Sequence, residues 1–153
     1  MALSRKKKNE SKNMHFSRED QRKILSSSSP FIVKEAYSSI RTNLLFSQKG
    51  DECPVFIVTS PTANNGKSIN SVNMAVSFAQ MGKKTLLIDA DMRNPTVHRL
   101  FSIPVKNGLS EILAGLTDSI TVSKTDIENL SVLTAGKIPP NPSELLASER
   151  TDK

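Results

Sequence analysis

Short runs of apolar residues predict three strands, at Val55–Thr59, Thr85–Ile88 and Leu130–Thr134. Runs of this length bounded by polar turns are typical of strands buried inside a sheet. Between the first two runs, residues 67–81 space their apolar side chains as a helix packed on a sheet does, and Gly82 is placed to end that helix. The pattern therefore predicts strand, loop, helix and strand, with the two strands parallel and the connection right-handed.

The loop that joins the first expected strand to the helix has the features of a phosphate-binding loop. Residues 59–68 read T-S-P-T-A-N-N-G-K-S. In such a loop, backbone N–H groups point at phosphate oxygens, Lys67 reaches the β- and γ-phosphates, and the Ser68 hydroxyl can bind Mg²⁺. The residues predicted to bind a nucleoside triphosphate are Thr62, Ala63, Asn64, Asn65, Gly66, Lys67, Ser68 and Ile69.

The loop departs from the standard phosphate-loop pattern G-x-x-x-x-G-K-[ST] in its first half. Pro61 stands where that pattern has glycine, and Asn64 and Asn65 occupy positions where glycine would turn easily. Asn is among the residues that most often adopt a positive φ, so the loop is compatible with a turn around phosphate. The alternative is a surface turn that happens to end in Gly-Lys-Ser, since Asn-Asn-Gly is itself strong turn chemistry.

Two acidic residues, Asp89 and Asp91, directly follow the second expected strand. Ligands of open parallel sheets bind beyond the carboxyl ends of the strands, and the phosphate loop follows the first strand at that same edge. Two carboxylates beside a triphosphate can hold Mg²⁺ directly or through water, and one can accept a proton from an attacking hydroxyl. The alternative is that they cap a helix or lie in a solvated loop.

Together these segments resemble the bacterial tyrosine kinases, which are deviant-P-loop ATPases. The resemblance is carried by the Gly-Lys-Ser loop, by L-L-I-D-A-D-M-R-N-P at residues 86–95 and by G-K-I-P-P-N-P-S-E-L-L at residues 136–146. It extends from about residue 34 to residue 149. It implies an α/β fold, a three-layer P-loop NTPase-like parallel sheet with flanking helices, and transfer of the γ-phosphoryl of ATP to tyrosine in exopolysaccharide synthesis and export.

The resemblance also assigns roles by position. Lys67 becomes the phosphate-binding lysine and Ser68 the Mg²⁺-binding hydroxyl, so the implied cofactors are ATP and Mg²⁺. Asp89 and Asp91 become the acids of the motif called Walker A′, one near the metal and one a candidate base. Arg93 is implied to position phosphate or the loop. The predicted catalytic residues are thus Lys67, Asp89 and Asp91, and the predicted metal ligands are Ser68 and Asp89.

The resemblance further implies partners. The family's helix before the core carries Glu-x-x-Arg-x-x-Arg and contacts a neighbouring subunit of a ring, giving a homo-oligomer. Here the three positions are Glu35, Ser38 and Arg41, so one charge-assisted contact is missing. The implied partners are protein tyrosine substrates and a membrane-embedded activator, a polysaccharide co-polymerase protein. The implied location is the cytoplasm, at the inner face of the cell membrane through that partner.

The net charge of +6 is concentrated at the start of the chain. Residues 1–30 carry eight Lys or Arg and three acidic residues, which leaves +1 for the remainder. This composition predicts a disordered basic leader over residues 1–30, which either attracts an anionic membrane surface or is a solvated tail. Nucleic acid is not expected as a partner, because Phe16 is the only aromatic residue of the leader. Residues 31–153 are expected, from the resemblance, to form the N-terminal part of a P-loop tyrosine-kinase domain.

A length of 153 residues suits one domain. The resemblance implies features that this sequence lacks after residue 146, namely a further apolar strand ending in Asp (Walker B) and a tyrosine cluster; Tyr37 is the only tyrosine. We therefore expect a sheet that is incomplete at the C-terminus. The expected function is that of an autophosphorylating ATP-dependent protein-tyrosine kinase, with a truncated or inactive form of it as a variant. The alternatives are a partition-type ATPase switch and a nucleotide-binding module without catalysis.

Overall fold

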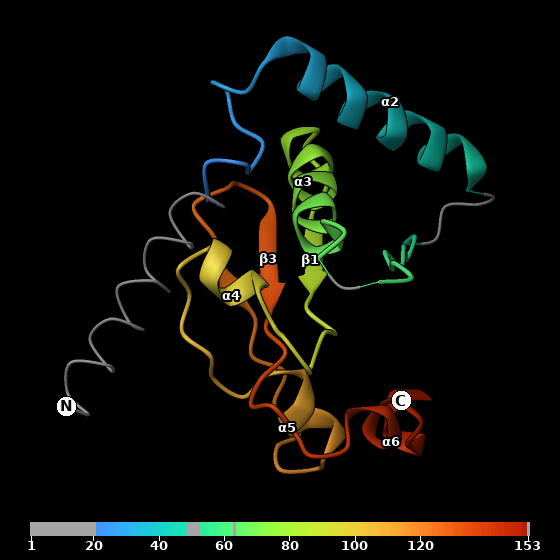
Figure 1. Ribbon diagram of the computed structural model, residues 1–153, viewed down its shortest axis with the longest axis vertical. Coiled ribbons are helices and arrows are strands. Elements are labelled where there is room, and N and C mark those ends of the chain that lie inside the picture. Colours follow the sequence, from blue (N-terminus) through green and yellow to red (C-terminus); the bar gives the residue numbers. More distant parts are fainter. Residues whose placement is uncertain (1–20, 49–52, 63, 153) are drawn as a thin grey trace.

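The computed structural model describes residues 21–48, 53–62 and 64–152. Figure 1 shows a small sheet with one long helix on its face, a second long helix across the top, and short helices below. The elements in chain order are α2 (Phe31–Ser47), α3 (Lys67–Gln80), β1 (Thr85–Ile88), α4 (Val97–Leu100), α5 (Leu109–Leu113), β2 (Ser123–Lys124), β3 (Leu130–Leu133), α6 (Pro142–Leu146) and the 3₁₀ helix η1 (Glu149–Asp152).

The described residues form a three-stranded sheet in the order β1-β3-β2. β1 and β3 are parallel, with Thr85 opposite Leu130 and Ile88 opposite Leu133. These are the second and third strands that the apolar runs predict, and both are confirmed. β2 pairs antiparallel to β3, which makes the sheet mixed. A two-residue strand is too short to leave a period-2 pattern in the sequence, so it was not predicted.

The first expected strand, at residues 55–59, is not formed, and that prediction is wrong. Residues 53–60 have no regular secondary structure, and Val55 and Ile57 are 83% and 89% exposed. A strand needs a neighbour for its backbone N–H and C=O groups. Among the described residues, the sheet consists of β1, β3 and β2, and none of these strands pairs with this segment. Instead, Phe56 stacks on Phe78 of α3, with ring centroids 5.6 Å apart.

The main core lies between α3 and the sheet. Val72 and Val76 of α3 and Val132 of β3 are fully buried, and Leu87 of β1 joins them. Leu25 belongs to the same cluster and is only 4% exposed. The predicted disordered leader included residues 21–30, whereas the structure buries Leu25 of this segment in the core. Residues 1–20 lie outside the described part of the chain.

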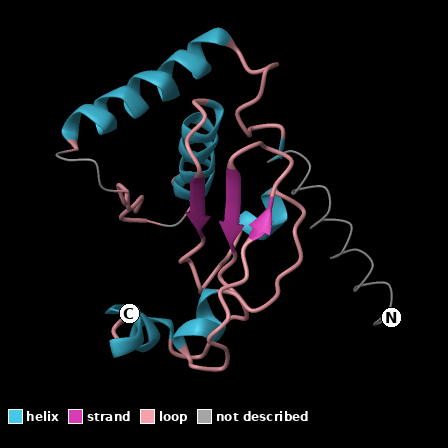
Figure 2. Ribbon diagram, turned by 180° about the vertical axis from the view of Figure 1, so that it is seen from behind, coloured by secondary structure: helices cyan, strands magenta, loops and turns pink. Residues whose placement is uncertain are grey.

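Helices cover one face of the sheet in the described residues. Figures 1 and 2 show α3 and α4 on the same side of β1 and β3, and Val97 and Leu100 of α4 belong to the main core. On the opposite face, Leu86 and Ile88 remain 48% and 47% exposed. The described residues therefore form two layers, one of strands and one of helices. The predicted three-layer fold has a second layer of helices, which is not among the described residues.

α2 lies across α3 (Figure 1), and its Val33 and Tyr37 are partly buried against the main core. Every residue of α2 is described, and none is fully buried. Arg41 holds it in place, because its Nη1 donates to the Ser77 carbonyl at 2.8 Å and to Ser77 Oγ at 2.9 Å. Its Nη2 donates to Ser38 Oγ at 3.0 Å. The serine at the middle position of the expected Glu-x-x-Arg-x-x-Arg pattern thus helps to direct Arg41 inward.

Candidate nucleotide-binding site

The candidate site begins at the loop that opens α3. Asn64 has φ 61° and Gly66 has φ 73°, so both adopt the left-handed conformation. Asn adopts this conformation more often than most residues, as the prediction for the loop assumed, and glycine adopts it most easily. Ser68 and Ile69 lie half-buried in the first turn of the helix, while Thr62 and Asn65 are exposed. Ala63, also predicted to bind nucleotide, lies outside the described residues.

The start of α3 has the electrostatics of an anion site. α3 has 14 residues and no acidic residue in its first turn. The N–H groups at the start of a helix have no partners within it, and the helix dipole adds partial positive charge there. Lys67 is the first helical residue, so its ammonium adds a full charge at the same end. This arrangement suits a phosphate group.

The structure brings the loop and the acidic turn together. Lys67 Nζ lies 2.5 Å from Asp91 Oδ2, and the two side chains are 34% and 21% exposed. The residues are 24 positions apart, and their contact exists because α3 and β1 run antiparallel, which returns the chain to the loop's end of the sheet. Of the two acids, it is Asp91 that faces the phosphate loop.

Asp91 is held as a charged carboxylate. Its Oδ1 accepts the N–H groups of Asn94 at 2.9 Å and Arg93 at 3.3 Å, which closes the turn after β1. Burial alone would raise the pKa of Asp91, but the hydrogen bond and the charge of Lys67, together with these two N–H groups, outweigh it. The pKa is therefore below its ordinary value, and Asp91 is ionised at neutral pH.

Asp89 is placed differently. It is only 5% exposed, and both of its oxygens accept backbone N–H groups: Oδ1 from Asp91 at 3.1 Å, and Oδ2 from Thr96 at 3.2 Å and Val97 at 3.1 Å. Burial raises the pKa of Asp89, and the hydrogen bonds offset this only in part. These contacts agree with the alternative in which the acid caps a helix, because Val97 is the first residue of α4.

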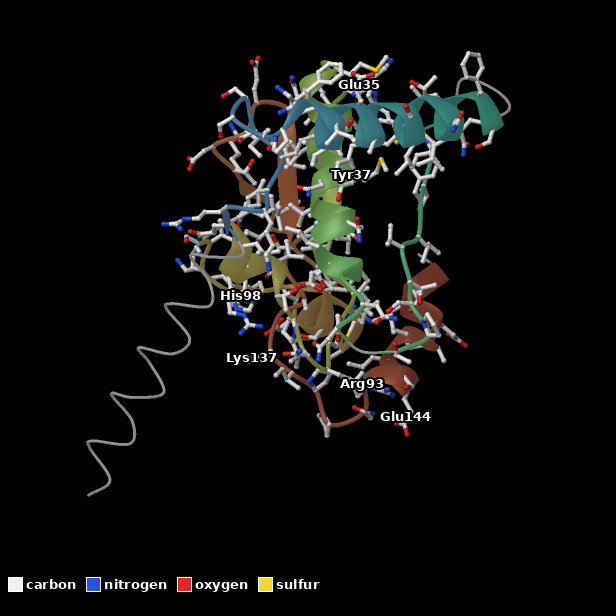
Figure 3. The ribbon with its side chains drawn as sticks, turned by 45° about the horizontal axis from the view of Figure 1, so that its top comes forward. Glu35, Tyr37, Arg93, His98, Lys137 and Glu144 are labelled. Atoms are coloured by element: carbon white, nitrogen blue, oxygen red, sulfur yellow. The ribbon has the colours of Figure 1, made fainter. Side chains whose placement is uncertain are left out.

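Arg93 connects the acidic turn to the C-terminal helix. Its Nη2 donates to Ser143 Oγ at 3.0 Å, across 50 positions of sequence. Figure 3 shows Arg93 beside Glu144, at the end of the molecule where α6 lies. The two strings that carry the family resemblance, at residues 86–95 and 136–146, thus meet at this pair.

A junction that the sequence analysis missed holds the second string in place. Glu111 Oε2 accepts the Gly108 N–H at 2.9 Å and the Ser110 hydroxyl at 3.1 Å, and Oε1 accepts the Lys137 N–H at 3.1 Å. Gly136 passes so close that a β-carbon there would lie 2.0 Å from Glu111 Oε2. The signal in the sequence was a glycine before each segment, Gly108 and Gly136.

The residues present fit a magnesium ion bound together with a nucleotide. Within the described residues there is no group of three or more His, Cys, Asp or Glu side chains that could hold a metal by themselves. Magnesium in phosphoryl-transfer sites is commonly bound by one or two protein oxygens, substrate phosphates and water. Ser68 in the first turn of α3 and Asp91 beside Lys67 can supply such oxygens. Asp89 has less capacity to do so, since backbone N–H groups occupy both of its oxygens.

A helix that starts at Gly66-Lys67-Ser68, with an acid at the carboxyl end of the next strand facing it, defines a P-loop-type α/β domain. The family model described as an AAA domain matches residues 62–149, which is more than half of the chain.

Curated relatives and a solved structure refine this class. The chain is 47% identical to the putative tyrosine-protein kinase CapB of Staphylococcus aureus, over 77% of this chain and 52% of CapB. It is 41% identical to the tyrosine-protein kinase YwqD of Bacillus subtilis, over 84% of this chain and 55% of YwqD. The kinase domain of the Escherichia coli tyrosine kinase ETK superposes with a TM-score of 0.70 at 37% identity, covering 76% of this chain and 46% of that one.

The chain therefore belongs to the bacterial tyrosine-kinase family, as the sequence strings implied. It spans about half the length of the curated relatives it matches. In the part of the chain that the structure describes, no helix has the length and apolar character needed to cross a membrane.

Proposed function

We propose that this chain binds Mg-ATP in the loop at residues 59–69 and serves as the nucleotide-holding part of a protein-tyrosine kinase. The observation that carries the proposal is the contact between Lys67 and Asp91 at the start of α3. A lysine ammonium and an ionised acid thus lie together at a helix end suited to phosphate. The chain's membership of the bacterial tyrosine-kinase family supports phosphoryl transfer from ATP as the chemistry of this arrangement.

In this proposal the loop amides and Lys67 hold the β- and γ-phosphates, and Ser68 and Asp91 supply oxygens to magnesium. Bound magnesium neutralises phosphate charge. When the γ-phosphoryl group moves from ATP to a phenolic oxygen, the bond to ADP breaks and the phenolic proton passes to a nearby base. Backbone N–H groups occupy both oxygens of Asp89, so Asp89 is not the base in this proposal. Asp89 and Arg93 then position the acidic turn.

The partners proposed are protein tyrosine residues, a membrane-embedded activator of the polysaccharide co-polymerase kind, and a second copy of the chain through α2. Their support is the resemblance to the family and the exposure of α2, including Phe31, Ile32 and Phe46. Arg41 is engaged with Ser77 in the same chain, so Glu35 is the more available residue of that pattern. We further propose a cytoplasmic location, at the inner face of the membrane through the activator, with a role in exopolysaccharide synthesis.

Calorimetric titration with Mg-ATP tests the binding site. Lys67→Ala should weaken binding by at least about thirtyfold, the effect of removing one partner of a hydrogen-bonded charge pair. Lys84→Ala is the matched control, because Lys84 is exposed beyond the far end of α3, and it should bind as the wild type does. Equal affinity of the Lys67→Ala variant and the wild type would refute the site.

The products formed from labelled ATP then test the chemistry. Phosphotyrosine supports the kinase, free phosphate without phosphotyrosine favours the partition-type ATPase switch, and tight binding with neither product favours a module without catalysis. The assay is run on the whole chain with a tyrosine-rich protein substrate and, separately, without one.

A further inference from the structure

A path of hydrogen bonds runs from α2 to the phosphate loop. The Tyr37 hydroxyl donates to Asn70 Oδ1 at 2.8 Å. Asn70 Nδ2 in turn donates to the Gly66 carbonyl at 3.0 Å. Figure 3 shows Tyr37 directed from α2 towards α3. Only one side chain therefore separates the hydroxyl from the last residue before α3.

The direction of each hydrogen bond on this path is fixed by the backbone. A carbonyl can only accept, so the Asn70 amide nitrogen must face Gly66 and the amide oxygen must face Tyr37. Tyr37 is therefore the donor in its bond to Asn70. A phenylalanine at position 37 would leave the Asn70 oxygen without this donor.

Asn73, the other hydrogen-bond partner of the Tyr37 hydroxyl, also has its amide orientation fixed by the backbone. Asn73 Oδ1 accepts the Leu25 N–H at 2.8 Å, which turns its amide nitrogen towards the Lys23 carbonyl at 3.0 Å and the Tyr37 oxygen at 3.2 Å. Asn73 is only 3% exposed. The Tyr37 hydroxyl thus accepts from a buried amide and donates to an exposed one, so its position is well determined.

The Gly66 carbonyl matters because of the peptide bond that it belongs to. A trans peptide is planar, and its C=O and N–H groups point in opposite directions. The orientation of the Gly66 carbonyl therefore sets the orientation of the Lys67 N–H, the first amide of α3. The same oxygen also accepts the Asn70 N–H at 3.0 Å, so it receives two hydrogen bonds from one residue. Gly66 itself is left-handed and offers no β-carbon to restrict the turn.

We infer that Tyr37 and Asn70 are positioning residues, which hold the Gly66–Lys67 peptide so that its N–H points at bound phosphate. This inference deepens the proposed Mg-ATP site and rests on it for its functional consequence. It assigns to α2 a role inside its own chain, since Tyr37 reaches the phosphate loop from that helix.

The test uses Tyr37→Phe and Asn70→Ala in the whole chain, with Mg-ATP affinity measured by calorimetry and unfolding measured separately. Each variant should weaken binding by about twofold to tenfold, the worth of one net hydrogen bond. The double variant should bind no more weakly than Asn70→Ala alone, because both changes break one path. Additive losses would overturn the inference.

Arg41→Lys is the matched control for a merely structural effect. It alters the contact of α2 with Ser77, which lies ten residues after Lys67 and so about 15 Å along α3. This variant should lose thermal stability but keep its affinity for Mg-ATP. If affinity follows stability in all three single variants, Tyr37 acts only by holding α2, and the inference is wrong.

The amide NMR signal of Lys67 separates the inference from the proposed function, since it is read in the nucleotide-free protein. It should shift in Tyr37→Phe and Asn70→Ala and stay in place in Arg41→Lys. A wild-type chain that fails to bind Mg-ATP refutes the proposed function, whereas an unmoved Lys67 signal in Tyr37→Phe refutes the positioning role whether or not ATP binds.

Discussion

The Lys67 ammonium of the phosphate loop is paired with the Asp91 carboxylate, 2.5 Å away. The pair joins the start of α3 to the end of β1, and it is partly exposed, so incoming phosphate can reach it. A triphosphate that takes Lys67 as a partner must share or replace Asp91, and the released carboxylate then lies where a magnesium ion can neutralise it. The proposed Mg-ATP site therefore predicts that the affinity for ATP and its dependence on magnesium are linked through this one contact.

Asp91→Asn should uncouple ATP affinity from magnesium. Without the carboxylate, Lys67 is available to phosphate and one negative charge is removed. Metal-free ATP should then bind about twofold to fivefold more tightly, in line with loss of a partly exposed ion pair. The advantage of Mg-ATP over ATP in the presence of a chelator should shrink. Calorimetry with and without magnesium measures both effects.

Asp118→Asn is the control for this prediction. Asp118 also pairs with a cation, Arg150, at 3.1 Å, but it is 91% exposed and belongs to a surface pair. Its removal should leave both affinities unchanged. An Asp91→Asn variant with the wild-type ratio of affinities would show that this acid does not face the nucleotide.

Asp89→Asn should destabilise the fold more than it alters binding. The amide keeps one acceptor oxygen in place of two, so at least one of the backbone N–H groups of Asp91, Thr96 and Val97 loses its partner, at a cost of about 1–3 kcal/mol. Denaturant unfolding measures this loss. An unchanged free energy of unfolding, combined with loss of the magnesium effect, would instead identify Asp89 as the metal ligand.

The pH dependence of that loss has a definite sign. Burial raises the pKa of Asp89 above its ordinary value of 3.8. The folded chain therefore binds this proton more readily than the unfolded chain does. The associated stability is present below pH 3.8 and is lost as the pH rises through the higher folded pKa. The stability advantage of the wild type over Asp89→Asn should accordingly shrink as the pH rises through this window.

The sequence predicted the elements whose evidence is local. The helix after the phosphate loop and the strand before Asp89 have clear apolar patterns and buried faces, and both are present in the structure. Residues 55–59 have an equally apolar pattern, but the described residues provide no strand beside them, and Val55 stays exposed. A strand depends on its neighbours, and an apolar run in one segment carries no information about them.

The candidate site was predicted unevenly for the same reason. Gly66, Lys67 and Ser68 form a contiguous motif, so the start of α3 could be located from the sequence. The different environments of Asp89 and Asp91 could not, because they depend on N–H groups at Thr96 and Val97 that only the folded turn brings close. Spacing identifies a pair of acids, whereas burial and hydrogen bonding decide what each of them does.

Glu111→Gln should weaken the junction between α5 and the loop after β3. The side-chain amide cannot accept at both positions where the carboxylate now receives N–H groups, from Gly108 and Lys137. The expected loss in the free energy of unfolding at neutral pH is about 1–3 kcal/mol. Glu144→Gln is the control, because Glu144 is exposed and accepts a hydrogen bond from the exposed Asn141 side chain; it should change stability little.

Acid should affect Glu111 in the opposite sense to Asp89. Burial alone would raise the pKa of Glu111, but the N–H groups of Lys137 and Gly108 and the Ser110 hydroxyl outweigh it, so the pKa lies below its ordinary value of 4.5. Its stabilisation is present above pH 4.5 and is lost as the pH falls through the lower folded pKa. The wild type should lose stability in this range and approach Glu111→Gln. Parallel curves for the two proteins would contradict the assignment.

Gly136→Ala and Gly82→Ala compare two glycines with nearly the same backbone. Their φ angles are 83° and 81°, so the left-handed conformation penalises alanine by a similar amount, about 1 kcal/mol, at both. A β-carbon at Gly82 meets nothing within 4 Å, whereas one at Gly136 would lie 2.0 Å from Glu111 Oε2 and 2.4 Å from Ser110 Oγ. Gly136→Ala should therefore lose about 1–3 kcal/mol more in denaturant unfolding, the usual cost of overpacking. Because the backbone cost cancels, the difference between the two variants measures how closely α5 is held against the loop after β3, and equal losses would mean that this junction is looser than the Glu111 contacts indicate.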